Sequence, residues 1–252
     1  GTVMRYNLID STGTFANFDY PLHDAGDFDA ITNLWIHIAL IVSADRLTTF
    51  ADGRPVADNE YGFYTGGDVQ VAANVAYPHP NTLTASLGGF GMTQDIVVGS
   101  RADRDQDRHF VGAMAGLMIS AYDLTIDQVQ CVFSTSEEFL PTQLSQCDNT
   151  PMGQLAVSFL SDSVDMVTHD ASVVTVSGGL AVTFSGVQFD ADADHRIEIA
   201  DFDYETDGEF TISFWATKED CTGGIYEYMY SHMKSTTGDA MWTDSSVNVY
   251  LG

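Results

Sequence analysis

Short strand-like runs separated by turn residues are the feature that most constrains how this chain can fold. The clearest run is 209–217, in which apolar residues recur at every second position: Phe210, Ile212, Phe214 and Ala216. This period of two is typical of an antiparallel strand that buries one face. Many such runs, frequent turn signals and very little helix predict an all-β fold, an antiparallel two-sheet jelly-roll sandwich.

One hairpin and one helix start stand out among these runs. Asp52-Gly53 separates two of them and favours a tight hairpin, because both residues tolerate positive φ. Thr125 is followed by Gln128 three residues later, which predicts a short capped helix that ends near Phe133. The predicted strands are 2–9, 35–43, 46–51, 54–57, 96–99, 109–122, 155–159, 164–168, 172–176, 180–184, 196–199, 209–217, 225–232 and 245–251.

The charge balance limits the partners that the chain can bind. It contains 36 acidic and 9 basic residues, a formal net charge of −27. Such a surface repels nucleic acid and anionic lipid, so we expect no nucleic-acid partner. It suits divalent cations, a saline medium or a basic partner. The longest apolar stretches, around 34–42 and 110–122, are too short to span a bilayer, so we expect no membrane insertion.

The three cysteines favour an oxidising setting. Cys131, Cys147 and Cys221 form no C-x-x-C pair, which argues against zinc and thioredoxin-type sites. Cys131 and Cys147 flank a short connecting segment and are the candidate disulfide, which leaves Cys221 over. The pairing of three cysteines cannot be deduced from sequence. We expect an extracellular or cell-surface location.

Two groups of motifs in the chain resemble one known family. Within 1–133 they are the run from Trp35 to Ala39, the Asp52-Gly53 hairpin, Val97-Val98-Gly99, Phe110-Val111-Gly112 and Leu124-Thr125. Within 154–252 they are Gly179-Leu180, Phe189-Asp190 and the run from Gly208 to Trp215. In their joint order and spacing, these motifs resemble laminin-G-like domains of the concanavalin A-like lectin/glucanase superfamily.

The resemblance implies a domain organisation in which two halves stand in reversed order. Residues 1–133 resemble the C-terminal half of such a sandwich, 154–252 resemble its N-terminal half, and 134–153 are interpreted as a linker. Because 154–252 joined to 1–133 would give one complete domain plus a linker, we expect the segment to be about one period of a tandem or polymeric array. Either neighbouring copies complete each half, or the two halves of one chain pack as a permuted sandwich.

Two D-x-D-x-D runs are the candidate metal sites. They consist of Asp103, Asp105 and Asp107 in one run and Asp190, Asp192 and Asp194 in the other. Alternate carboxylates in a loop can converge on calcium, a cation that prefers oxygen ligands. Solvated loop charge is the alternative, and Arg104 and Arg108 can neutralise the first run. The family resemblance favours calcium, since laminin-G-like domains often hold it at a rim of the sandwich.

Aromatic residues near the C-terminal end are the candidate ligand contacts. Tyr226, Tyr228 and Tyr230 alternate along one predicted strand, and Trp242 lies in a polar loop. Such rings can stack on sugars, or they can form a packing layer of the sheet. We take Tyr228 and Trp242 as the candidate ligand-binding residues.

The sequence contains no pattern that indicates catalysis. The paired-acid motif of the superfamily's glucanases, E-x-D-x-x-E, does not occur, and neither does the G-x-S-x-G elbow. We therefore predict a non-enzymatic, extracellular structural or adhesive module of a tandem-repeat or polymeric protein, such as a filament or surface coat. Its partners would be neighbouring copies or domains. The alternative is a calcium-dependent carbohydrate-binding module of a larger secreted protein, with glycans as partners.

Overall fold

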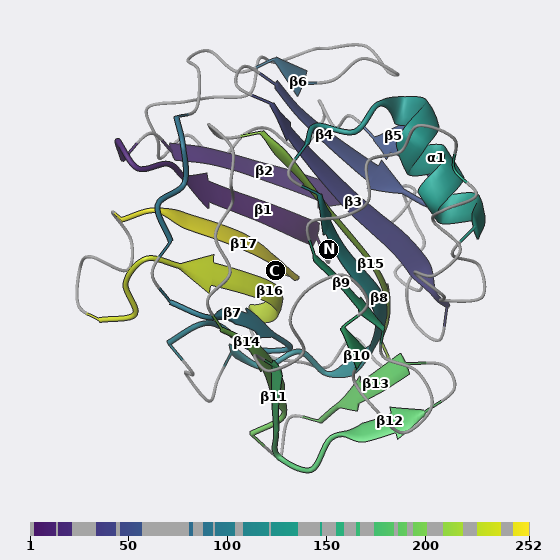
Figure 1. The fold of residues 1–252 in the computed structure, drawn as a ribbon, viewed down its shortest axis with the longest axis vertical. Coiled ribbons are helices and arrows are strands. Elements are labelled where there is room, and N and C mark those ends of the chain that lie inside the picture. Colours follow the sequence, from purple (N-terminus) through teal and green to yellow (C-terminus); the bar gives the residue numbers. More distant parts are fainter. Residues whose placement is uncertain are drawn as a thin grey trace.

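The computed structural model places the chain in two antiparallel β-sheets and one helix, which confirms the all-β two-sheet sandwich (Figure 1). The structure describes residues 3–13, 15–21, 34–43, 46–56, 81–82, 88–92, 94–103, 108–120, 122–135, 147, 155–158, 165–166, 174–183, 186–190, 194–200, 209–218, 226–237 and 244–251. Among these residues, no helix is long and apolar enough to cross a membrane.

One sheet has seven strands and the other has ten. In spatial order, the seven-stranded sheet contains β11 (Val174–Ser177), β14 (Arg196–Ile199), β7 (Ile96–Val98), β16 (Glu227–Met233), β17 (Ser246–Leu251), β1 (Val3–Ile9) and β2 (Phe15–Pro21). The main path of the ten-stranded sheet contains β10 (Asp165–Met166), β9 (Leu155–Ser158), β8 (Gly112–Ser120), β15 (Phe210–Thr217), β3 (Ile36–Ser43), β4 (Arg46–Ala51) and β5 (Arg54–Val56). Beside this path, β12 (Ala181–Thr183) pairs with β13 (Gly186–Phe189), β13 pairs with β8, and β6 (Asn81–Thr82) pairs with β4.

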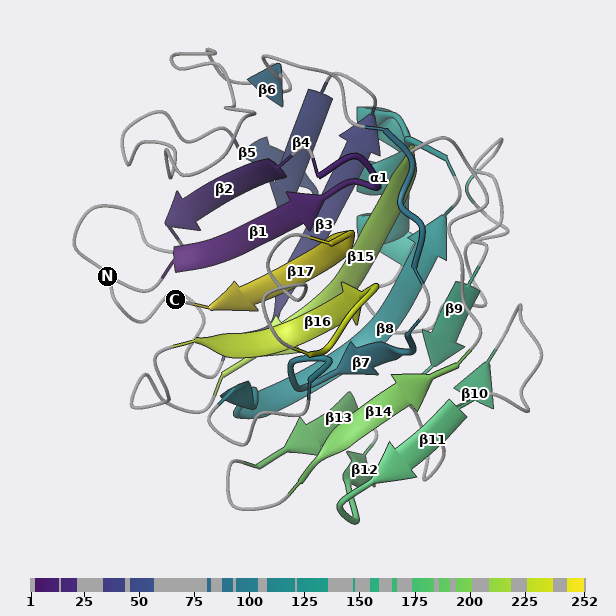
Figure 2. The same cartoon turned by 90° about the vertical axis from the view of Figure 1, so that its left-hand side faces the viewer.

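Strands from 1–133 and from 154–252 are interleaved within both sheets. In the ten-stranded sheet, β15 inserts between β8 and β3. In the seven-stranded sheet, β16 and β17 fill the space between β7 and β1, as Figure 2 shows. Of the two arrangements compatible with the sequence, the structure has the one in which both halves of one chain pack together.

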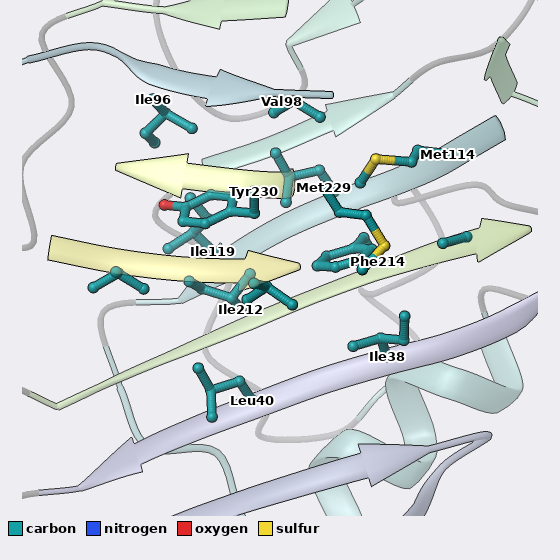
Figure 3. Packing of buried hydrophobic residues seen from close by; sticks show 14 of the residues in the cluster. Ile38, Leu40, Ile96, Val98, Met114, Ile119, Ile212, Phe214, Met229 and Tyr230 are labelled. Atoms are coloured by element: carbon teal, nitrogen blue, oxygen red, sulfur yellow. The ribbon is translucent and has the colours of Figure 1, made fainter. Parts of the chain in front are cut away.

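The core lies between the two sheets and follows the period-two pattern of the sequence. In β15, Phe210, Ile212, Phe214 and Ala216 all belong to this core, as predicted. Met4, Tyr6 and Leu8 of β1 reach it from the opposite sheet. Figure 3 shows Ile212 and Phe214 packed beside Met229 and Tyr230. The buried face thus contains residues from both halves of the chain.

The predicted hairpin and helix both form. Asp52 and Gly53 have φ values of 49° and 68°, and they join β4 to β5. The helix α1 (Ile126–Thr135) begins after Thr125, whose hydroxyl accepts from Gln128 N at 3.3 Å. Gln128 Oε1 in turn accepts from Thr125 N at 2.8 Å, so the capping is reciprocal.

Helix α1 covers the outer face of the ten-stranded sheet. Its residues Val129 and Val132 form a second apolar cluster with Ala39 and Ile41 of β3 and with residues of β4 and β8. A disulfide between Cys131 and Cys147 holds the helix to the following segment, with 5.8 Å between the Cα atoms. Cys221 lies outside the described residues.

Candidate functional site

Two of the three described aspartates in the D-x-D-x-D runs, Asp103 and Asp194, contact arginines. Asp103 Oδ1 accepts from Arg101 Nε at 2.7 Å, and a second contact makes this pair bidentate. The carboxylate of Asp194 pairs with Arg196. Asp190 is exposed, and its backbone N–H donates to His195 Nδ1 at 3.0 Å. Arginine contacts reduce the negative charge that a cation would meet at Asp103 and Asp194.

The other three aspartates, Asp105, Asp107 and Asp192, lie outside the described residues. In the described part of the chain, no three His, Cys, Asp or Glu residues come close enough together to hold a metal ion. Calcium binding by either run therefore stays a prediction.

A β-bulge in β16 lies between Tyr228 and Tyr230, two of the three alternating tyrosines. Tyr228 lies opposite Tyr250 of β17, whereas Tyr230 lies opposite Val249, so the register shifts between them. The extra residue turns Tyr230 into the core, where it is fully buried. Tyr228 stays on the outer face of the seven-stranded sheet.

Tyr228 is the centre of an aromatic and cationic group, here called the Arg–Tyr cluster, that consists of Arg5, Arg101, Arg108, Tyr226, Tyr228 and Tyr250. The ring of Tyr228 stacks on that of Tyr250 with centroids 4.5 Å apart. Tyr226 meets Tyr250 edge to face at 5.7 Å. Because Tyr228 is only 5% exposed, stacking within the protein occupies the ring that we took as a sugar contact.

Three of the chain's nine basic residues lie over these rings. Arg108 Cζ is 4.8 Å from the centroid of Tyr226, and Arg5 Cζ is 5.7 Å from the same centroid. Arg101 Cζ is 5.7 Å from Tyr228. Burial raises the pKa of the Tyr228 hydroxyl, although the positive charge of Arg101 opposes this effect. Cation–π contacts of this kind hold the guanidinium groups in fixed positions.

A row of polar side chains lies next to the Arg–Tyr cluster on the same outer face. Asn7, Asn248 and Ser231 stand side by side on β1, β17 and β16. Ser231 Oγ donates to Asn248 Oδ1 at 2.7 Å, and Asn248 Nδ2 donates to Asn7 Oδ1 at 3.4 Å. Ala102 N donates to Ser231 Oγ at 3.0 Å and closes one end of the row. Ser231 and Asn248 are buried, so these hydrogen bonds lie within the protein.

An open groove of about 430 Å³ lies on the opposite side of the sandwich, beside the start of α1. Its floor contains the buried residues Ile41 and Thr48 of the ten-stranded sheet. Asp123 and Asp127 line it with two carboxylates, and Ser43 Oγ donates to Asp123 Oδ2 at 2.9 Å. The remaining lining residues are Leu124, Thr125 and Ile126.

Two buried histidines, His37 and His232, have lowered pKa values. His37 packs against the stacked rings of Phe133 and Trp215, with centroids 5.6 and 5.2 Å away. Burial lowers the pKa of His37 to about 3 and that of His232 to about 4, so both rings are neutral at pH 7. His232 Nε2 lies 2.9 Å from the carbonyl oxygen of Gln94.

Sequence reasoning named Tyr226 and Tyr228 but did not predict that Arg5, Arg101 and Tyr250 lie beside them. Arg5 and Tyr250 belong to the first and last strands and become neighbours only through the pairing of β1 with β17. The alternation in 2–9 did place Arg5 and Asn7 on the same face, which was the available signal. Trp242 lies outside the described residues.

Comparison of this chain with protein-family models, with curated proteins and with solved structures finds no match.

Proposed function

We propose that this protein is a non-enzymatic, extracellular structural or adhesive module of a tandem-repeat or polymeric protein, such as a filament or surface coat. The observation that carries the proposal is the interleaving of strands from 1–133 and 154–252 in both sheets. Neighbouring copies can form the same strand pairings if one copy supplies residues 1–133 and the next copy supplies residues 154–252. Such exchange joins copies without any new interface.

The charge and the disulfide support the rest of the proposal. Copies that each carry −27 repel one another, so assembly is expected to need salt or divalent cations that screen the charge. The Cys131–Cys147 disulfide favours an oxidising, extracellular setting.

The test is the mass of the native particle together with electron microscopy, in calcium and in chelator. We expect filaments or particles much heavier than the 27.4 kDa chain in calcium, and smaller particles in chelator. A particle of one chain under every condition, including molar salt, would refute assembly through exchange.

A second candidate is a calcium-dependent carbohydrate-binding module of a larger secreted protein. The outer face of the seven-stranded sheet favours it, because the Arg–Tyr cluster there adjoins the row of Asn7, Asn248 and Ser231. Glycan-array binding with and without calcium tests this candidate. Tyr226→Ala should remove binding, since this ring is the partly exposed one of the cluster, whereas Tyr122→Ala on another surface should not.

Substitution of the second aspartate run tests the calcium requirement of this candidate. Asp190→Asn, Asp192→Asn and Asp194→Asn together should abolish calcium-dependent binding if that run holds the ion. Retained calcium dependence in this variant would exclude the run as the metal site.

A further inference from the structure

The groove beside α1 combines an apolar floor with acidic walls. Ile41 and Thr48 at its floor are buried, and Ile126 adds a half-buried aliphatic surface. Asp127 is exposed and Asp123 is half-buried. A ligand that fills this groove therefore meets aliphatic carbon at its centre and carboxylate oxygens at its edge.

The two carboxylates make few contacts within the protein. Asp123 accepts one hydrogen bond, from the neutral hydroxyl of Ser43. No arginine, lysine or histidine pairs with Asp123 or Asp127 among the described residues. This sets them apart from Asp103 and Asp194, which arginines already neutralise. The negative charge of the groove is thus available to a cation.

The start of α1 is capped by side chains and carries a negative charge. Reciprocal capping already uses the backbone N–H groups of Thr125 and Gln128. Asp127 lies in the first turn and offsets the positive end of the helix dipole. The charged groups that the groove presents to a ligand are thus the carboxylates of Asp123 and Asp127.

We infer that this groove binds a lysine or arginine side chain from a basic segment of a different protein. The aliphatic stem of such a side chain packs on Ile41 and Ile126, and its charged end reaches Asp123 and Asp127. The net charge of −27 draws a basic segment toward the surface at long range, and it repels a second copy of this chain. The inference is independent of the proposed function, because its partner is neither a neighbouring copy nor a glycan.

The test measures binding of an acetylated and amidated hexalysine peptide by calorimetry. Asp123→Asn and Asp127→Asn each remove one carboxylate, and asparagine at 123 still accepts from Ser43. We expect each change to weaken binding about tenfold, or about 1.4 kcal/mol. The matched control is Asp244→Asn, which removes an equal charge from a half-buried residue just before β17 of the seven-stranded sheet and should weaken binding less than twofold.

A second measurement keeps the test independent of overall charge. Methyl resonances of Ile41 and Ile126 should shift when the peptide is added, and a hexa(acetyl-lysine) peptide should cause no shift. Equal losses in all three variants, with no methyl shift, would show general attraction to an acidic surface and would overturn the inference. Binding of calcium or of a small amine to the groove without binding of hexalysine would also overturn it.

Discussion

A buried ion pair connects the two sheets and gives the sharpest test of the packing. Lys218 follows β15 in one sheet, Glu227 begins β16 in the other, and Lys218 Nζ contacts Glu227 Oε1. The two side chains are only 5% and 2% exposed. Val111 N also donates to Glu227 Oε2 at 3.1 Å, so the carboxylate holds three segments together.

Lys218→Met should be strongly destabilising, because it leaves the Glu227 carboxylate buried without its cation. Breaking a buried pair in this way costs about 3–5 kcal/mol, a large part of the roughly 5–15 kcal/mol that stabilises a typical domain. Adding Glu227→Gln removes the stranded charge, and the glutamine oxygen still accepts from Val111. The double variant should therefore regain at least about 2 kcal/mol over the single one.

Urea unfolding at pH 7, followed by tryptophan fluorescence, measures these differences through the transition midpoints. Lys234→Met is the control, because Lys234 is an exposed lysine whose loss changes the net charge equally; it should stay within about 0.5 kcal/mol of wild type. A loss below about 1 kcal/mol for Lys218→Met, or a double variant no more stable than the single one, would refute the reasoning.

Three further predictions concern a glycine, a disulfide and a histidine. Gly112→Ala should lower the free energy of unfolding by at least about 2 kcal/mol in the same urea assay, since its Cβ would lie 2.2 Å from the backbone oxygen of Thr217. Gly89→Ala is the control, because its Cβ meets no atom within 4 Å and the change should be nearly neutral. Equal losses of stability in the two variants would contradict the packing around Gly112. Replacing both members of the Cys131–Cys147 disulfide by serine opens a loop with a sequence separation of 16; we expect a loss of about 3 kcal/mol, seen as a lower Tm, and an unchanged Tm would show that the link adds nothing. The pKa of His37 is lowered to about 3 in the folded protein, so below its ordinary value of 6.5 only the unfolded chain takes up this proton. Stability should therefore fall from about pH 6.5 toward pH 3, by about 2 kcal/mol at pH 5 for this residue; in His37→Leu the difference between urea midpoints at pH 7 and pH 5 should shrink, and an unchanged difference would contradict the burial of a neutral ring.

Local patterns in the sequence predicted most strands, because alternation and turn chemistry act over a few residues. The run 196–199 coincides with β14, and the Asp52-Gly53 hairpin and the start of α1 lie where the sequence places them. The predictions missed β2, β6 and β13. In β13, Val187 and Phe189 gain their partners from β8, which is far away in sequence.

The candidate sites depend on contacts that local patterns do not encode. The bulge in β16 sends Tyr230 inward and leaves Tyr228 outside, although strict alternation places both on one face. The groove beside α1 joins β3 to the residues before the helix, across about 80 positions between Ser43 and Asp123. Only the tertiary structure brings such segments together.

The insertion of β15 between β3 and β8 also determines when the chain can fold. On the ribosome, β3 and β8 emerge well before 210–251, so both sheets lack central strands until 210–251 has been synthesised. Contacts between segments so distant in sequence give a high contact order, for which folding takes about milliseconds to seconds. Nascent 1–133 therefore exposes unpaired strand edges to other chains during this interval, and a chaperone that shields them would raise the yield of folded protein.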